Sequence, residues 1–425
     1  MLLTFTVDNF KSFNSLNTLS MFKGNVLKKK DHLMKIGNSD VLKGAVIYGS
    51  NGGGKTSFID AIMVSQRMII TDLTTESFNH LPEMYCRISQ ENKTRPTLFE
   101  YIFETEGKCY RYTLRAVLSE RKIISEILSE CNLETSTFKT IFVRDDSAEN
   151  RFDFESGGFF SPEEVSKLKD STQDLDDTDH TTLLTLLTFK KKYNPDSQLH
   201  VFNRVMKWFL TKLHVNTFPI ITKEQSLAYA ELLSHFISDF KNAEFVLSTD
   251  VPKNILNQTE KFLDKDERKS VVMKGICFEK NEGTITSYIM KIHHDSTEEG
   301  FDIFEESGGT LQTLDYSFLL SDAYKDNTYI IDEFGSKMHP VLAKRFIDLF
   351  YASHIDDNIQ LIIATHHTSL MTLDLYRSDE IWFIDKNNGE SELYSLQEFQ
   401  PRSDVVVDKN YYSGRYGALP VFDEW

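Results

Sequence analysis

The order of apolar and polar residues predicts strands and helices that follow one another along the chain. Leu2–Val7 and the apolar run Val41–Tyr48 are typical of strands, and the second run leads into the glycine-rich Gly49–Gly54. The spacing after Lys55 predicts a helix with one apolar face, made of Phe58, Ile59, Ile62 and Met63. The glycines therefore lie between a strand and a helix.

Several short β-prone stretches follow between Leu98 and Val143, and Glu106-Gly107 supplies a hairpin turn between the first two. Consecutive strands with short links predict an antiparallel sheet beside the strand that precedes the glycines.

Helical periodicity runs throughout the span from about Ser161 to Lys265. In His200–Leu213 it predicts a buried stripe made of Val201, Phe202, Val205, Met206, Phe209 and Leu210. We interpret this span as a helical insertion. It lacks sustained heptads, so a long coiled-coil arm is not expected.

Strands and helices then alternate to the end of the chain. The predicted elements are strands at Val271–Phe278 and Thr284–Ile292, a helix from Ser307 through Ala323, a strand at Thr328–Asp332, a helix from about Pro340 to Tyr351, a strand at Gln360–Ala364, and a final pair at Ile381–Asp385 and Glu392–Ser395. This alternation predicts an α/β fold with a mainly parallel core sheet. The expected parts are an N-terminal lobe (1–160), the helical insertion (161–265) and a C-terminal lobe (266–425).

Composition narrows the class of protein. Of 425 residues, 40% are apolar and 26% charged, which is typical of a globular chain. The net charge of −17 argues against a protein that coats nucleic acid with its whole surface. The four cysteines form no CxxC pair, which excludes a thiolate zinc site and a disulfide scaffold and fits a reducing cytosol. Asp8 interrupts the apolar start and no run of about 18 apolar residues occurs, so we expect a cytoplasmic protein without a membrane span.

Gly49–Thr56, with the sequence GSNGGGKT, matches all eight positions of the P-loop pattern. Its glycines let successive backbone N–H groups converge on phosphate oxygens, where a side chain would collide. We expect Lys55 to reach the β- and γ-phosphates and the Thr56 hydroxyl to ligate Mg²⁺. The strand before and the helix after favour this interpretation over an ordinary glycine-rich turn.

Two further strands end in residues that can act on a phosphate. Asp332, at the end of an apolar strand, is placed to hold Mg²⁺ opposite Thr56, and Glu333 to orient or deprotonate a water. Such pairs also occur as plain helix caps, but the P-loop upstream favours the catalytic interpretation. His366 follows the next strand, where it is expected to face the γ-phosphate rather than serve as a surface cap.

Ser307-Gly308-Gly309 begins a helix and offers exposed N–H donors, a second phosphate-binding element. Because a P-loop already covers one face of the γ-phosphate within its own subunit, this element predicts that another protomer covers the other face.

These motifs, in this order, resemble those of the ABC-type ATPases, on the SMC, RecF and overcoming-lysogenisation-defect side of that group. The resemblance implies an ABC-type P-loop ATPase head with a mainly parallel core sheet, an antiparallel β subdomain and a helical insertion. It implies ATP and Mg²⁺ as cofactors, with Thr56 and Asp332 as metal ligands and with Glu333 and His366 as catalytic residues. The nucleotide-binding residues that it implies are Asn51, Gly52, Gly53, Gly54, Lys55, Thr56, Ser57, Ser307, Gly308 and Gly309.

Other segments extend this resemblance. Ser336–Pro340 resembles the D-loop, with Met338 as a departure, and Asn9–Phe13 resembles the opening of this branch. In that opening we expect, first, that Phe10 and Phe13 are core residues and, second, that Lys11 contacts the phosphate side of the site. Two residues, Gln90 and Glu100, lie near the expected Q-loop region, and no motif selects either.

The chain most resembles the RloA/AbiLi-type ATPases of bacterial abortive-infection loci. This resemblance covers nearly the whole chain, including the closing run Gly414–Pro420. That resemblance implies a head-to-tail homodimer, or a larger assembly of copies, that regulates a separately encoded effector in phage defence, an RloB-type nuclease. One alternative is a RecF-like ATPase that clamps DNA, with a basic stripe from Lys28–Lys30 and Lys190–Lys192. Another is a scaffold that binds ATP and barely hydrolyses it.

Overall fold

The computed structural model describes residues 1–173, 179–189, 191–219, 221–248, 270–273, 275–281, 284–321, 325–402 and 405–419. The chain divides into two compact units. Unit 1 contains Met1–Asn216, Lys325–Phe334 and Asp356–Trp425, and unit 2 contains Thr217–Tyr324 and Gly335–Ile355.

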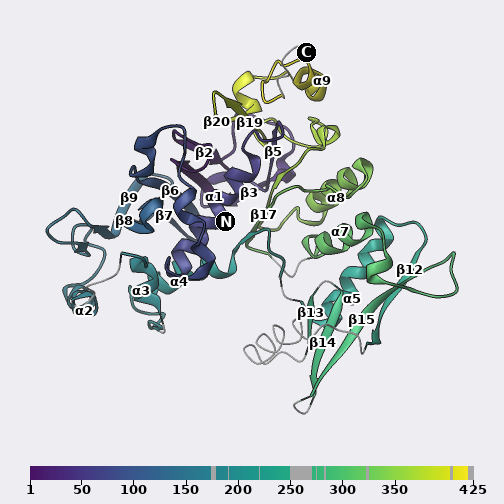
Figure 1. The fold of residues 1–425 in the computed structure, drawn as a ribbon, viewed down its shortest axis with the longest axis horizontal. Helices are drawn as coiled ribbons and strands as arrows, with labels where there is room; N and C mark the ends of the chain where they lie inside the picture. The colour runs from purple at the N-terminus through teal and green to yellow at the C-terminus, as the bar shows by residue number, and fades with distance from the viewer. Residues whose placement is uncertain are drawn as a thin grey trace. The chain divides into compact units, whose positions relative to one another are not determined.

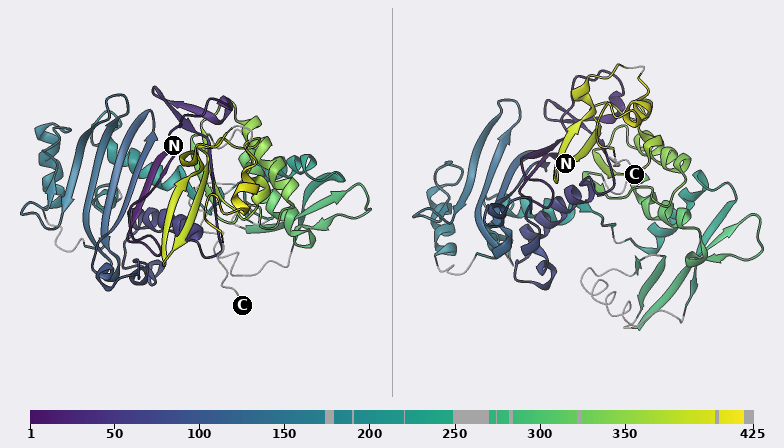
Figure 2. Two further views of the ribbon diagram at one scale, coloured as in Figure 1. Left: turned by 90° about the horizontal axis from the view of Figure 1, so that it is seen from above. Right: turned by 45° about the horizontal axis from the view of Figure 1, so that its top comes forward.

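One sheet of unit 1 is antiparallel, in the order β10-β9-β8-β7-β6-β1-β2. Its strands are β1 (Leu2–Asp8), β2 (Asn17–Ser20), β6 (Thr97–Thr105), β7 (Lys108–Val117), β8 (Lys122–Asn132), β9 (Thr137–Asp145) and β10 (Phe152–Asp153). The hairpin between β6 and β7 turns at Glu106 and Gly107, both with positive φ (51° and 77°), as the sequence predicts. Figure 2 shows the long blue strands of this sheet side by side.

The second sheet of unit 1 is mainly parallel, in the order β11-β17-β18-β5-β19-β20, and only β20 runs antiparallel to its neighbour. Its strands are β5 (Gly44–Gly49), β11 (Leu213–Val215), β17 (Asn327–Ile331), β18 (Ile359–Ala364), β19 (Ile381–Asn387) and β20 (Glu390–Ser395). Strand β5 is buried along its whole length between β18 and β19, so the chain that follows it emerges at the carboxyl edge of the parallel strands. A small hairpin of β3 (Leu33–Ile36) and β4 (Ser39–Leu42) precedes β5.

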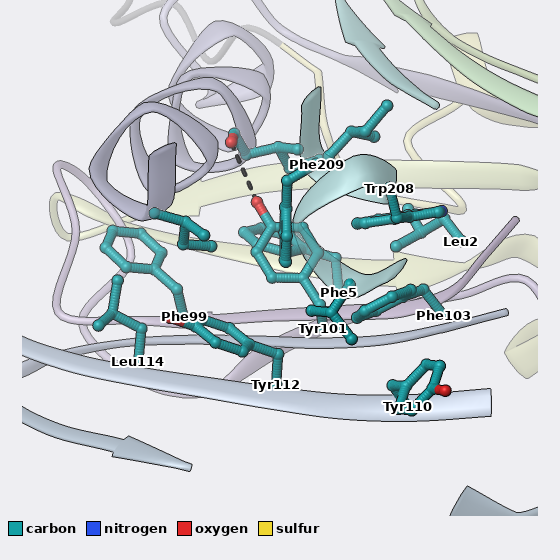
Figure 3. Close-up of a cluster of buried hydrophobic side chains, with 14 of the residues drawn as sticks. Leu2, Phe5, Phe99, Tyr101, Phe103, Tyr110, Tyr112, Leu114, Trp208 and Phe209 are labelled. Carbon is teal, nitrogen blue, oxygen red and sulfur yellow. Dashed lines mark hydrogen bonds between the residues drawn. The ribbon is translucent and has the colours of Figure 1, made fainter. Parts of the chain in front are cut away.

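Two helices of unit 1, α1 (Lys55–Ile70) and α4 (His200–Thr211), lie next to each other (Figure 1). Their buried side chains and those of the antiparallel sheet form one hydrophobic core. Gln66 of α1 donates hydrogen bonds to the carbonyl oxygens of Phe209 and Leu213. Figure 3 shows the aromatic centre of this core, where Trp208 stacks on Phe103 at 4.1 Å between ring centroids. The other helices of unit 1 are α2 (Pro162–Thr172), α3 (Leu183–Thr188) and α9 (Val407–Tyr412).

Unit 2 has its own antiparallel sheet, in the order β12-β15-β14-β13, and β16 pairs with β15. Its strands are β12 (Phe240–Leu247), β13 (Ser270–Met273), β14 (Ile276–Asn281), β15 (Thr284–His294) and β16 (Phe301–Asp302). In the described part of this unit the α-helices are α5 (Lys223–Glu231), α7 (Gly308–Ser317) and α8 (Pro340–Ser353). This unit has a core of its own, in which Leu233, just after α5, packs with Met290 and Ile292 of β15.

The α/β head with a mainly parallel core sheet and an antiparallel sheet is confirmed. The span 161–265 differs from the expected helical insertion, because its described part also contains strands β11 and β12 and is divided between the two units at Asn216. Strand β11 completes the edge of the parallel sheet beside β17, a pairing that helical periodicity cannot reveal. The last residues of this span, 249–265, lie outside the described residues.

Three element boundaries are corrected. Val41–Tyr48 is divided between two strands in two sheets, because β4 pairs with β3 whereas β5 pairs with β18 and β19. Val271–Phe278 is a hairpin, because Gly275 turns at a φ of 76° between β13 and β14. The helix after Ser307 ends at Ser317 and continues as a 3₁₀ turn to Leu320, and Ala323 lies outside the described residues.

Candidate functional site

The P-loop joins β5 to α1 at the carboxyl edge of the parallel sheet. Gly54 precedes α1 with a φ of 121°, which strongly favours glycine. A Cβ atom on Gly54 would lie 2.5 Å from Ser391 Oγ, and one on Gly49 would lie 2.4 Å from the carbonyl oxygen of Ile384. Close packing therefore requires glycine at Gly49 and Gly54, and at Gly54 the backbone conformation requires it as well.

Lys55 is buried at the start of α1, and its ammonium binds the loop itself. Its Nζ donates to the carbonyl oxygens of Gly49 and Ser50 at 2.7 and 3.0 Å. Burial lowers the pKa of Lys55, and the carboxylates of Asp332 and Glu333 oppose that shift. The ammonium therefore lies within the electrostatic influence of both acids.

Two carboxylates follow β17. The backbone N–H of Glu333 donates to Asp332 Oδ1 at 3.0 Å, and Glu333 has a left-handed φ of 53°. The next residue, Phe334, donates its N–H to the carbonyl of Ala364 at 2.9 Å, which ties this turn to the end of β18. Asp332 is half-buried, whereas Glu333 is exposed to solvent.

His366 follows β18 and the buried Thr365. The N–H of Thr365 donates to the carbonyl of Ile47 in β5, and its hydroxyl donates to the carbonyl of Phe334 at 2.8 Å. Partial burial and the Lys55 ammonium lower the pKa of His366, against the carboxylates of Glu333 and Asp332. This shift favours the neutral imidazole, which can donate a hydrogen bond through one ring nitrogen and accept one at the other.

One cavity of about 560 Å³ in unit 1 brings these motifs together. It is lined by Ser50, Asn51, Gly52, Gly54, Lys55, Thr56, Ser57, Asp332, Glu333, Ala364, Thr365 and His366. The Thr56 hydroxyl and the Asp332 carboxylate are the oxygen donors that suit Mg²⁺ held jointly with a phosphate. Within the described part of the chain, no group of three or more His, Cys, Asp or Glu side chains could hold a metal ion by itself.

Ser307, Gly308 and Gly309 belong to unit 2 and lie at the N-terminus of α7. The Ser307 hydroxyl caps the helix by accepting the N–H of Thr310 at 3.1 Å. A Cβ on Gly309 would lie 3.1 Å from the carbonyl oxygen of Lys337, so the glycine admits the D-loop-like segment beside the helix. Gln312 of α7 accepts the N–H of Lys337 at 2.9 Å and fixes that segment. Ser307 and Gly308 are exposed at the helix end.

The opening Asn9–Phe13 is mostly structural. Phe10 and Phe13 are fully buried core residues, as expected. Lys11 was expected to contact the phosphate side of the site. It instead forms an ion pair with Asp60 of α1 and does not line the cavity.

The Q-loop candidates and the lysine runs add nothing to the cavity. Neither Gln90 nor Glu100 lines it. Lys29 Nζ donates to the carbonyl of Asp374 at 2.5 Å, and Lys190 lies outside the described residues.

The closing run packs against the end of the parallel sheet. Tyr416 is buried and stacks on Phe383 of β19 at 5.5 Å, and Ala418 is fully buried, whereas Leu419 is half-buried. Pro420 lies outside the described residues.

Sequence reasoning missed two residues that hold the site in place. Ser391 of β20 donates to the carbonyl of Gly53 at 2.7 Å, and Asn216 accepts the N–H of Asp332 at 2.8 Å. Neither lies in a motif, and no local signal marks them. Both contacts come from strand pairings between distant parts of the chain.

A family model described as "AAA domain, putative AbiEii toxin, Type IV TA system" matches residues 45–372, which is more than half of the chain. The chain belongs to this family. The match begins in β5 and includes the P-loop, Ser307–Gly309, the Asp332-Glu333 pair and His366. This AAA domain is therefore of the P-loop ATPase superfamily.

No curated protein matches the chain in sequence. Among solved structures, the SMC head bound to the C-winged helix domain of ScpA is 14% identical with a TM-score of 0.45, and the match covers 94% of this chain and 99% of that one. The SMC head domain from Thermotoga maritima is also 14% identical, with a TM-score of 0.36 and coverage of 93% and 98%. An SMC head with an extended coiled coil, bound to the C-terminal domain of ScpA derived from Pyrococcus furiosus, is 13% identical with a TM-score of 0.35 and coverage of 94% and 99%. Among the described residues, no helix is long and apolar enough to cross a bilayer.

Proposed function

We propose that this AAA domain binds ATP in the cavity of unit 1 and hydrolyses it. The observation that carries the proposal is that the P-loop, the acidic pair after β17 and His366 after β18 line one cavity. Lys55 exchanges its bonds to the loop carbonyls for bonds to phosphate oxygens, and the loop N–H groups bind the same phosphates. Thr56 and Asp332 would hold Mg²⁺, which when bound neutralises phosphate charge.

In this scheme Glu333 orients and deprotonates the attacking water, because it lies beside the metal ligand and reaches solvent. His366 donates a hydrogen bond to the γ-phosphate as a neutral imidazole. The lowered pKa favours the neutral form, in which one ring nitrogen still carries a proton that it can donate.

Phosphate release tests the assignment. We expect Glu333→Gln to bind ATP as the wild type does and to lose turnover, since the amide keeps the shape of the side chain but cannot accept the proton. Lys55→Ala should lose binding itself. Normal turnover by Glu333→Gln would show that Glu333 is not the base. Binding without turnover by the wild type, with and without the product of the neighbouring gene, would favour the non-hydrolysing scaffold.

We further propose that two copies assemble head to tail, with Ser307–Gly309 of each capping the ATP held by the other. The first N–H groups of a helix have no partner within the helix, and the helix dipole makes this end positive. Ser307 uses its hydroxyl on Thr310, which leaves the N–H groups of Gly308 and Gly309 for an anion. The γ-phosphate is such an anion, so its loss on hydrolysis would release the partner.

In the cell, we propose a role in abortive-infection defence as an RloA/AbiLi-type subunit that controls a separately encoded effector, an RloB-type nuclease. The family description, which names an AbiEii toxin and a type IV toxin–antitoxin system, supports a role in such systems. We expect protection from phage to need both the chain and the product of the neighbouring gene, and to be lost in Lys55→Ala. Growth arrest by the chain expressed alone would show that it is itself the toxin. Salt-sensitive binding to duplex DNA would favour the RecF-like alternative.

A further inference from the structure

Asn216 sits at the end of β11, beside the end of β17. Strand β11 pairs in parallel with β17, with Val215 opposite Ile330. The backbone N–H of Asn216 donates to the carbonyl of Ile330 at 2.9 Å, and its side-chain Oδ1 accepts the N–H of Asp332 at 2.8 Å. Since the backbone N–H of Asp332 can only donate, the oxygen of the Asn216 amide must face it.

The backbone of Asn216 makes this contact specific to a few residue types. Its φ is 48°, in the left-handed region that asparagine, aspartate and glycine tolerate best. Of these three, glycine has no side chain with which to accept the N–H of Asp332.

The turn that carries both carboxylates is thus held at both ends. At its start, the backbone N–H of Asp332 donates to the side chain of Asn216. At its end, the carbonyl of Phe334 accepts a hydrogen bond from the hydroxyl of Thr365. Within the turn, Asp332 Oδ1 accepts the N–H of Glu333, whose left-handed φ is sparsely populated for a residue with a side chain. A turn in such a conformation needs supports from outside to keep one arrangement.

We propose that Asn216 is a positioning residue for the Mg²⁺–nucleotide site, which fixes the Asp332 carboxylate where it would meet the cation. This role rests on the proposed function, because it assumes that Asp332 is a metal ligand. Outer partners of metal ligands orient the ligand, and their loss weakens metal binding even though they never touch the ion.

The test compares binding of a fluorescent, non-hydrolysable ATP analogue with saturating Mg²⁺ and in excess EDTA. Asn216→Gly accepts the backbone conformation but removes the acceptor, whereas Asn216→Asp keeps an acceptor oxygen. Asn388→Gly is the matched control, because Asn388 has a φ of 50° in the exposed turn between β19 and β20.

With Mg²⁺ present, we expect Asn216→Gly to bind about 10-fold more weakly than the wild type, and Asn216→Asp to restore binding to within about 3-fold. In EDTA all variants should match the wild type within about 2-fold, because the P-loop alone then holds the phosphates, and Asn388→Gly should match it in both conditions. An Asn216→Gly variant that is unchanged with Mg²⁺, or equally weakened in EDTA, would overturn this role and leave the proposed function standing. A wild type that binds no nucleotide in either condition would overturn both.

Discussion

The hydroxyl of Ser391 donates a 2.7 Å hydrogen bond to the carbonyl oxygen of Gly53, across 338 residues of sequence. The backbone of Ser391 also donates to the carbonyl of Ser12, so β20 holds the opening segment and the P-loop together. The nucleotide loop is therefore supported from outside its own strand and helix. Its shape depends on the antiparallel edge of the parallel sheet.

Gly54→Ala should abolish nucleotide binding. The alanine would have to adopt a φ of 121°, and its Cβ would lie 2.5 Å from Ser391 Oγ. The loop must therefore move away from the phosphate-binding conformation. Gly107→Ala is the control, because Gly107 also has a positive φ but nothing lies within 4 Å of its added Cβ. Titration with labelled ATP measures both. Equal binding by the two variants would show that the contact with Ser391 does not shape the loop.

Trp208→Ala should destabilise unit 1 strongly, and Leu210→Ala should not. Trp208 is fully buried and stacked on Phe103, so its removal should cost about 3–5 kcal/mol. Leu210 is 55% exposed, and truncations at such surface positions usually cost within about 0.5 kcal/mol. Urea unfolding monitored by circular dichroism compares the two midpoints. A larger shift for Leu210→Ala would mean that α4 is rotated about its axis.

That pair also shows where helical periodicity gives a wrong prediction, because it includes the exposed Leu210 in the buried stripe and omits the buried Trp208. Seven residues separate Val201 from Trp208, nearly two helical turns, so Trp208 lies above Val201 on the buried face. Leu210 lies two residues further along, about 200° around the helix from Trp208. A stripe defined by apolar residues alone, without their angular positions around the helix, therefore extends toward Leu210 on the exposed side and misses Trp208 on the buried side.

The P-loop and the strands that carry Asp332 and His366 could be predicted because their signals are local. Glycine spacing, an apolar strand and the residue that follows it all lie within a few positions of one another. Their convergence on one cavity followed from a general rule for parallel sheets, whose carboxyl ends share one edge.

The supports of the site could not be predicted in this way. Asn216 meets Asp332 across 116 residues, and only because the three-residue β11 joins the edge of the sheet. Ser391 reaches Gly53 only because β20 turns back beside β19. Contacts of this kind depend on strand order, which a single sequence does not encode locally.

The pKa of His366 should move in opposite directions when its two charged neighbours are removed. Partial burial and then the Lys55 ammonium hold it below the ordinary value of 6.5, so Lys55→Met should raise it. The Glu333 carboxylate acts the other way, so Glu333→Gln should lower it further. Because the folded-state pKa is depressed, stability contributed by the neutral ring is present above pH 6.5 and is lost as the pH falls through the lowered value.

NMR titration of protein labelled at histidine measures this pKa without any turnover. A wild-type value above 6.5, or a shift of the same sign in both variants, would contradict the arrangement of charges around the cavity.

Ser307→Asp should block ATP-dependent assembly while leaving the protein folded. Aspartate is as good a helix cap as serine, so α7 keeps its N-terminus, but its carboxylate would repel the partner's γ-phosphate. Thr222→Asp adds the same charge at the cap of α5 in the same unit and should assemble normally. Light scattering after gel filtration with ATP and Mg²⁺ compares them. Loss of assembly in both variants would point to a general effect of negative charge.

A mixing experiment tests most directly whether ATP is held between the P-loop of one copy and Ser307–Gly309 of another. In the Glu333→Gln background, Lys55→Ala and Ser307→Asp should each remain monomeric in sedimentation velocity with ATP and Mg²⁺, whereas Glu333→Gln alone should dimerise. Mixed together, the two variants should form dimers with one ATP per pair, because one P-loop and one Ser307 element remain intact across the same interface. A mixture that stays monomeric, or a Ser307→Asp variant that dimerises alone as well as Glu333→Gln does, would contradict the account.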